Sequence, residues 1–156
     1  MTQTSVLAPV AGRAVLLADV PDPVFSAGMV GYGAAVDPPR EVIDAVAPVS
    51  GKLLKLMPHA FVVLTPDGVG VLVHLGLDTV ALKGEGFTTH VSQGDDVTAG
   101  QVITTYDVPL IEAKGLNPII PVVVMDERSP ENVIASAAVS AGADIASGAS
   151  LFTANK

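Results

Sequence analysis

The sequence predicts a mostly β fold, an antiparallel β-sandwich or flattened barrel built from two related halves, with one or two short helices. Three observations lead to this prediction. Short apolar runs fill the first two-thirds of the chain, 15 glycines and 12 prolines divide the sequence, and two short patterns occur twice. Many short strands separated by turn residues are typical of sandwiches and barrels.

Six apolar segments carry the strand prediction, because each is bounded by turn-forming residues. These strands are expected at residues 14–18, 53–56, 61–65, 69–75, 102–105 and 121–124. Two short helices are also expected. One spans Asp107–Gly115, with a capping residue first and glycine last, and the other begins at Ser129 with Pro130 in its first position.

Two recurring patterns indicate an internal duplication. APVAGR at residues 8–13 returns as APVSGK at residues 47–52. VSQGDDVTAG at residues 91–100 returns as VSAGADIASG at residues 139–148, and each copy is expected to form a strand, a turn and a strand. One match alone can arise because similar turns recruit similar residues. Two matched pairs favour two related halves.

Length and composition favour a single cytoplasmic domain. The 156 residues suggest one domain at residues 5–155, preceded by a flexible N-terminus of residues 1–4. No uncharged apolar run is long enough to span a bilayer, and MTQTSVLAPV lacks the pattern of a secretory signal. The absence of cysteine excludes disulfides and thiolate chemistry. A net charge of −8 argues against nucleic acid or anionic membranes as partners and favours a basic protein.

One hairpin is expected to bring two histidines together. Residues 59–74 read HAFVVLTPDGVGVLVH, two apolar runs around a Thr-Pro-Asp-Gly turn. If Pro66 and Asp67 form the centre of the turn, His59 and His74 are equidistant from it and face each other, with Cβ atoms about 4.5–5.5 Å apart. A bulge at Gly68 would move the register by one residue.

A pair of opposed imidazoles in an apolar hairpin indicates a functional site, whereas a single histidine is more often a core residue. Two imidazolium ions this close would repel, so at least one ring should be neutral near neutral pH. A neutral ring nitrogen is both a nucleophile and a metal ligand. Two chemistries therefore stay open: one histidine accepts a group that the other stabilises, or both bind a metal.

The segments around these histidines resemble the glucose-type enzyme IIA domain of the bacterial sugar phosphotransferase system. VLVHLGLDTVALKGEGF at residues 71–87 resembles the phosphorylation-site signature of that family. Other matching strings are APVAG at 8–12, DVPDPVF at 19–25, MVG at 29–31, PHAF at 58–61, GDDV at 94–97 and PVVV at 121–124. The similarity covers about residues 5–155 and implies the fold of the family, a duplicated hybrid motif.

The resemblance implies a role for each site residue. His74 would accept a phosphoryl group on Nε2 from the phosphohistidine of the general histidine-containing phosphocarrier protein and pass it to a cysteine of an enzyme IIB domain. His59 would stabilise the phosphoryl oxygens, and the backbone carbonyl near Gly76 would hold the Nδ1 hydrogen of His74. Asp22 and Asp78 would face an arginine of the phosphocarrier.

An apolar rim is implied to dock the partners, and it consists of Val24, Phe25, Met29 and Val30. Core packing explains Met29 and Val30 nearly as well, and a solvated turn explains Asp78 equally well. No cofactor is implied as a requirement, although the His59–His74 pair could bind zinc with a further ligand from a partner. A separate enzyme IIB/IIC partner would select the sugar, whether glucose, N-acetylglucosamine or several.

Three residues depart from the pattern of the family. Met57 stands where a threonine could hydrogen-bond the first histidine, Leu75 replaces a phenylalanine, and Lys55 replaces an aromatic residue of the rim. These departures put the support of His59 in question and suggest a different partner preference.

Two other function classes fit part of the sequence. A zinc peptidase family with a similar duplicated β architecture uses His-x-x-x-Asp, which His74 and Asp78 reproduce, but its distant His-x-His has no counterpart here. A regulatory binding module is the other class, since glucose-type domains also bind transporters and metabolic enzymes according to their phosphorylation state. His90 is expected to be an ordinary surface residue.

Overall fold

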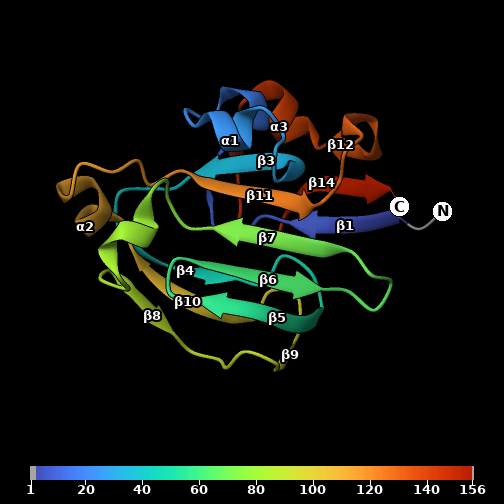
Figure 1. Ribbon diagram of the computed structural model, residues 1–156. Helices are drawn as coiled ribbons and strands as arrows, with labels where there is room; N and C mark the ends of the chain where they lie inside the picture. The colour runs from blue at the N-terminus through green and yellow to red at the C-terminus, as the bar shows by residue number, and fades with distance from the viewer. Residues whose placement is uncertain (1–2, 156) are drawn as a thin grey trace.

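The largest sheet of the protein has eight strands in the order β13-β2-β3-β11-β7-β6-β5-β9, and all its pairings are antiparallel (Figure 1). It belongs to a computed structural model that describes residues 3–155. The strands are β2 (Gly12–Leu16), β3 (Gly31–Asp37), β5 (Gly51–Met57), β6 (Ala60–Leu64), β7 (Gly70–His74), β9 (Asp96–Val97), β11 (Ile120–Met125) and β13 (Asp144–Ile145).

Two smaller antiparallel sheets complete the β structure. One has the order β1-β14-β12, and the other has the order β4-β10-β8. Their strands are β1 (Gln3–Leu7), β14 (Ser150–Asn155) and β12 (Val133–Ala135), and β4 (Val42–Val46), β10 (Val102–Asp107) and β8 (Phe87–Thr89). The helices are α1 (Pro23–Ser26), α2 (Val108–Ala113) and α3 (Ala137–Ala141), with 3₁₀ turns η1 (Leu17–Asp19), η2 (Thr79–Leu82) and η3 (Pro130–Asn132). The predicted mostly β class with short helices is confirmed.

All six predicted strands form, as β2, β5, β6, β7, β10 and β11. The helix predicted after Asp107 is α2, and the Asp107 carboxylate accepts a hydrogen bond from the backbone of Leu110 at 3.2 Å. The helix predicted at Ser129 is wrong in kind, because only the single turn η3 forms there and Ser129 makes no side-chain cap. Helices α1 and α3 were not predicted, since four or five residues are too few for a helical hydrophobic period.

The N-terminal boundary also differs from the prediction of a flexible segment at residues 1–4. Gln3 and Thr4 belong to β1, where they pair with Asn155 and Ala154 of β14. Residues 1 and 2 lie outside the described residues. Gln3 and Thr4 are therefore part of the β structure, because this ladder joins the two ends of the described chain.

The repeated patterns occupy equivalent places in the two halves of the molecule. Gly12 pairs with Ile145 between β2 and β13, and Gly51 pairs with Val97 in the same way between β5 and β9. Backbone bonds match too, since Gly148 donates to the Ala8 carbonyl and Gly100 to the Ala47 carbonyl, both at 2.9 Å. The predicted duplication is therefore visible in the pairing.

One detail of that duplication differs from the expected strand, turn and strand. Only the second strand of each copy forms, as β9 and β13. The first valine of each copy is elsewhere, since Val139 lies within helix α3 and Val91 lies outside any strand. Helix α3 ends at Gly142, whose φ of 64° is the left-handed conformation common just after a helix. The same local pattern therefore takes different secondary structure in its two places.

The eight-stranded sheet is apolar on both faces. Its inner face meets the two smaller sheets in the main core, whose fully buried side chains include Phe61, Tyr106 and Phe152. Its outer face carries a second cluster, in which Phe25 of α1 packs with residues such as Leu72 of β7. Side chains alternate along a strand, so His74 points to the same outer face as Leu72. The histidine therefore lies at the edge of a buried apolar cluster.

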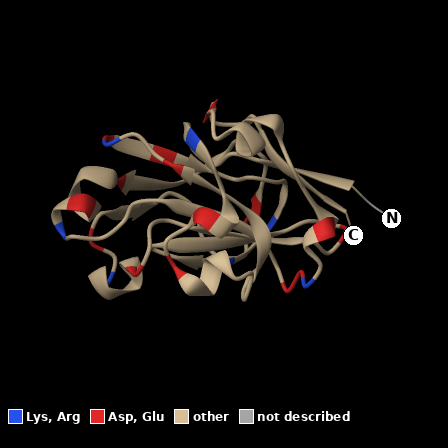
Figure 2. Cartoon of the chain, turned by 90° about the horizontal axis from the view of Figure 1, so that it is seen from above, with Lys and Arg blue, Asp and Glu red and all other residues tan. Residues whose placement is uncertain are grey.

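Acidic residues outnumber basic ones by 16 to 8. Figure 2 shows Asp and Glu spread over many elements, with fewer Lys and Arg between them. Within residues 3–155, no helix is long and apolar enough to cross a membrane.

Candidate active site

His74 is the last residue of β7 and is paired with Ala60, not with His59 as predicted from the hairpin arithmetic. The hairpin loop has three residues instead of two, since Thr65 and Val69 still pair through a backbone bond of 2.9 Å. Gly68 closes the loop with a φ of 87°. Three-residue hairpins need a left-handed residue at this place, which glycine supplies, and the register moves by one residue.

His59 reaches His74 by another route. It lies in the tight turn between β5 and β6, and its carbonyl accepts a hydrogen bond from the backbone N–H of Leu75 at 2.7 Å. The two imidazole rings have centroids 5.2 Å apart in a T-shaped arrangement. The histidines are therefore neighbours, as expected, although the turn brings them together and not the ladder.

The tautomer of His74 follows from one short hydrogen bond. Its Nδ1 lies 2.6 Å from the carbonyl oxygen of Gly76. A carbonyl oxygen can only accept, so Nδ1 carries the hydrogen. In the neutral ring the lone pair is then on Nε2, which is the nitrogen left for a nucleophilic or metal-binding role.

Burial keeps both imidazoles neutral around neutral pH. Desolvation lowers the pKa of His74, against the opposing effects of the Gly76 hydrogen bond and of the carboxylates of Asp22 and Asp78. Desolvation also lowers the pKa of His59, and the neighbouring His74 lowers it further. A neutral ring retains the lone pair that a nucleophile needs.

The comparisons with known proteins decide the family. A family model described as the phosphoenolpyruvate-dependent sugar phosphotransferase system, EIIA 1, matches residues 4–129. The chain belongs to this family. It is a glucose-type EIIA phosphocarrier component of the phosphotransferase system, and it acts in phosphoryl transfer.

Individual relatives agree with this assignment. The glucose-specific EIIA component of Halalkalibacterium halodurans is 43% identical over 121 residues, covering 76% of this chain and 69% of the relative. The mannose-specific EIIBCA component of Corynebacterium glutamicum is 43% identical over 119 residues, which are 76% of this chain but only 17% of that longer protein. The solved glucose permease IIA of Mycoplasma capricolum superposes with a TM-score of 0.85 at 34% identity, covering 98% of this chain and 96% of that one.

Helix α1 packs beside His74. Asp22 caps it, with Oδ1 accepting from the backbone N–H of Val24 at 2.9 Å and of Phe25 at 3.4 Å. Phe25 is buried, and its ring centroid lies 5.3 Å from that of His74. An aspartate followed by proline is a helix-start signal that could have revealed α1 in the sequence. Asp22 therefore has a structural task besides any contact with a partner.

The other predicted rim residues divide into two kinds. Val24 and Met29 are 44% and 62% exposed, so they are open to a partner. Val30 is half-buried against the outer apolar cluster, and its carbonyl accepts from the backbone of Asp126 at 3.0 Å. Val80 was not predicted and is 62% exposed in η2, two residues after Asp78. Val80 lies within the signature around His74, and this position could have indicated it as a further rim residue.

Asp78 differs from Asp22 in having no capping task. It precedes η2 in the left-handed conformation, at a φ of 60°, is exposed, and makes no side-chain cap bond. Its carboxylate is thus directed to solvent beside the site.

His90 is exposed elsewhere and has its Nε2 2.6 Å from the hydroxyl of Thr105, which in turn donates to Asp44 at 2.7 Å.

The departures noted in the sequence lie at the edge of the site. Met57 is the last residue of β5 and is 37% exposed, so it adds apolar surface near His59 instead of a hydroxyl. Leu75 is fully buried in the main core. Lys55 is exposed on β5 beside the irregular pairing of β5 with β6.

The two adjacent histidines, His59 and His74, are the candidate metal ligands of this site. Among residues 3–155, no group of three or more His, Cys, Asp or Glu is placed to hold a metal ion. His74 and Asp78 therefore do not form part of a complete metallopeptidase site within the described chain.

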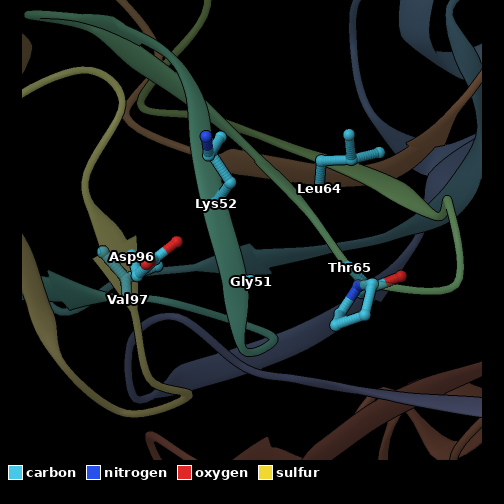
Figure 3. Close-up of a pocket in the computed structure, with 7 residues that line it drawn as sticks. Gly51, Lys52, Leu64, Thr65, Asp96 and Val97 are labelled. Carbon is cyan, nitrogen blue, oxygen red and sulfur yellow. The ribbon is translucent and has the colours of Figure 1, made fainter.

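One surface hollow is remote from the histidines. It has a volume of about 480 Å³ and is lined by residues that include Lys52, Leu64 and Asp96 (Figure 3). Leu64 ends β6 at the side of the hairpin loop, whereas Ala60, the partner of His74, begins that strand. The hollow therefore lies at the end of the hairpin opposite to His74.

Proposed function

We propose that His74 is the phosphoryl acceptor of this EIIA domain. The observation that carries the proposal is the bond between its Nδ1 and the Gly76 carbonyl at 2.6 Å, which leaves Nε2 as the nucleophile. The Nε2 lone pair forms a bond to phosphorus as the bond to the imidazole nitrogen of the phosphocarrier breaks. In the second transfer, a cysteine thiolate of an enzyme IIB domain attacks phosphorus and the Nε2–phosphorus bond breaks.

His59 stabilises the group in transit. Its ring lies beside His74 at a centroid distance of 5.2 Å, within reach of a phosphoryl group on Nε2. The three equatorial oxygens carry the charge in phosphoryl transfer, and an N–H donor directed at them lowers the barrier. An imidazole that also takes up a proton becomes positively charged and stabilises the phosphoryl oxygens more strongly.

The partners are the histidine-containing phosphocarrier protein and an enzyme IIB domain. Asp22 and Asp78 lie near enough to His74 for their carboxylates to raise its pKa, so they would also attract a basic partner. Partner docking is assigned to Val24, Phe25, Met29 and Val30. Phe25 packs beside the ring of His74, and the exposed Val24 and Met29 would exclude water from the labile phosphohistidine. Some relatives are named EIIBCA components, and the match covers only a small part of these longer proteins. They support the IIB partnership.

The cellular setting is proposed as the cytoplasm, with residues 5–155 forming one EIIA domain. The sugar is selected by the IIB/IIC partner, and relatives are named as specific for glucose, mannose or N-acetylglucosamine. Regulation of transporters or metabolic enzymes through the same apolar rim is compatible with this role. The His59–His74 pair would also bind zinc, with a further ligand supplied by a residue of a partner.

Phosphorylation with purified components tests the proposal. The protein is incubated with phosphoenolpyruvate, enzyme I and the phosphocarrier, and its intact mass is measured. One phosphoryl group is expected in the wild type and in the control His90→Gln, and none in His74→Gln. The group should be lost in acid and retained in alkali, as for an imidazole phosphoramidate. An acid-stable product, or a labelled His74→Gln protein, would refute the assignment.

A further inference from the structure

The loop that presents the Gly76 carbonyl to His74 has an unusual backbone. Gly76 has a φ of 85°, and two residues later Asp78 has a φ of 60°. Glycine adopts the left-handed conformation freely and aspartate does so at some cost, so the sequence of this loop suits its shape. The contacts described next show which groups outside the His74–Gly76 pair hold the loop.

Thr79 closes this loop with its side chain. The residue is fully buried, and its hydroxyl donates a 2.8 Å hydrogen bond to the carbonyl of Leu75. This bond spans the segment that contains Gly76. A buried hydroxyl without a partner is costly, so the loop is held in the one shape that satisfies it.

Two side chains also press against Gly76 from the core. A Cβ atom at Gly76 would lie 2.6 Å from Cγ2 of Thr79 and 2.8 Å from the hydroxyl of Tyr106. Tyr106 is fully buried, stacks on Phe87 and donates its hydroxyl to the Pro118 carbonyl at 3.0 Å. The adjoining Leu77 N–H donates to the carbonyl of Asn117 at 2.9 Å. The underside of the loop is thus supported at several points.

We propose that Thr79, with Tyr106 beneath the loop, is a positioning residue for phosphoryl transfer. It holds the Gly76 carbonyl on Nδ1 of His74 and thereby keeps Nε2 unprotonated for attack. The inference rests on the proposed role of His74 as the acceptor. Neither side chain touches the reacting atoms, so their effect passes through the Gly76 carbonyl.

The physical reason is that a neutral imidazole has two tautomers. If the Gly76 carbonyl moves away, the hydrogen can reside on Nε2, and that form offers no lone pair to phosphorus at the exposed position. Small displacements of groups that position reactants reduce rates strongly. Loss of the Thr79 hydroxyl should therefore change the tautomer of His74 before it changes the fold.

Three substitutions separate positioning from stability. Thr79→Val keeps the shape and removes the hydroxyl, whereas Thr79→Ser keeps the hydroxyl. Thr104→Val is the matched control, since Thr104 is also fully buried but its hydroxyl makes no hydrogen bond within the described residues. For each protein, ¹⁵N NMR gives the protonated nitrogen and titration of His74, rapid quench gives the rate of phosphoryl acceptance, and thermal unfolding gives stability.

The expected result is a loss of Nδ1 protonation and a fall of about tenfold or more in acceptance rate for Thr79→Val. Thr79→Ser should stay near the wild type, and Thr104→Val should be unchanged in both measurements. A Thr79→Val protein with the wild-type tautomer would overturn the proposal, whatever its stability. Equal impairment of Thr79→Ser would also overturn it, because the hydroxyl would then not be the cause.

A second variant applies if Thr79→Val does not fold. Tyr106→Phe removes only the hydroxyl below Gly76, and a smaller change of the His74 tautomer in the same direction is expected. An unaltered tautomer in that variant would contradict the proposal. The NMR measurements use unphosphorylated protein, so they test the role of Thr79 even if the wild type accepts no phosphoryl group and the proposed function fails.

Discussion

His59 and His74 hold their rings 5.2 Å apart, although they are not partners in the β6–β7 ladder. Ala60 occupies the ladder position opposite His74, and the turn after β5 directs His59 toward the same place. The backbone of His59 is anchored as well, by the N–H of Leu75 at 2.7 Å. Within residues 3–155, a backbone carbonyl sets the tautomer of His74 and none is bonded to the ring of His59, so the two rings are unequal.

This inequality predicts that the two histidines fail at different steps. His74→Gln should abolish phosphoryl acceptance, because the acceptor nitrogen is gone. His59→Gln should still accept the group but pass it to the IIB cysteine about 10²–10³ times more slowly, a change of about 3–4 kcal/mol, since an amide cannot carry a full positive charge. Radiolabelling measures acceptance and coupled sugar phosphorylation measures donation. An unlabelled but folded His59→Gln protein would reverse the roles.

Acceptance should depend on pH through the lowered pKa of His74. Because burial keeps this pKa below the ordinary value of 6.5, the neutral, reactive ring prevails at and above that pH. The rate of phosphoryl acceptance should therefore be level above about pH 6.5 and decline only below it. A rate that already declines between about pH 8 and pH 7 would contradict this. The same phosphocarrier preparation serves at every pH.

Stability should fall over the same acidic range. His59 and His74 have lower pKa values in the folded protein than in the unfolded chain, where the value is about 6.5. Below that pH the unfolded chain binds more protons, so the free energy of unfolding decreases until both folded histidines are also protonated. Urea unfolding at a series of pH values measures the effect. The double variant with glutamine at both positions should show a shallower decrease.

Asp22 should show two separable effects. Asp22→Asn retains an oxygen that can cap α1 but removes the charge, so stability should change little while the pKa of His74 falls. Asp22→Ala removes the cap as well and should cost about 1 kcal/mol of stability. NMR titration of His74 and urea unfolding measure the two effects. An unchanged His74 titration in both variants would show that the charge does not act on the site.

Gly76→Ala should destabilise the protein more than the control Gly94→Ala. Both glycines have left-handed backbones, with φ of 85° and 95°, so each alanine costs about 1–2 kcal/mol in strain. Only at Gly76 does the added Cβ meet Thr79 and Tyr106, whereas nothing lies within 4 Å at Gly94. Overpacking should add about 1–3 kcal/mol. Equal losses of unfolding free energy for the two variants would mean that Thr79 and Tyr106 move aside from the added Cβ without cost.

Zinc should bind at modest affinity, because two neutral imidazoles supply only half of a tetrahedral site. Isothermal titration calorimetry of the wild type, His59→Ala and the control His90→Ala tests this. Binding should be lost in His59→Ala and retained in His90→Ala. Unchanged binding in His59→Ala would exclude the pair as the site.

Much of the fold could be predicted because its signals are local. Apolar runs between turn residues identified β2, β5, β6, β7, β10 and β11, and the repeated APV patterns identified the duplication. Helices α1 and α3 were missed since each is shorter than two helical turns. The wrong hairpin register came from one residue, Gly68, whose left-handed backbone adds a third residue to the loop.

The site residues could be named from sequence because the signature around His74 is contiguous. Thr79 and Tyr106 could not be assigned a role in this way, although Thr79 lies within that signature. The contact of Tyr106 with Gly76 joins segments about 30 residues apart, and nothing in either segment alone indicates it. Long-range packing of this kind requires the folded chain.

Local sequence decides which segments of this protein become strands and turns, because alternation, β-branched residues, glycine and proline act within a few residues of chain. It also places the two histidines at the first and last positions of one hairpin segment, which meet at the open end of the hairpin. The tertiary fold decides what those histidines are chemically. Desolvation by burial lowers the pKa of His74, and the Gly76 carbonyl selects its tautomer. Solvent exclusion and backbone position depend on distant segments packing together, so they arise only when the sheets assemble.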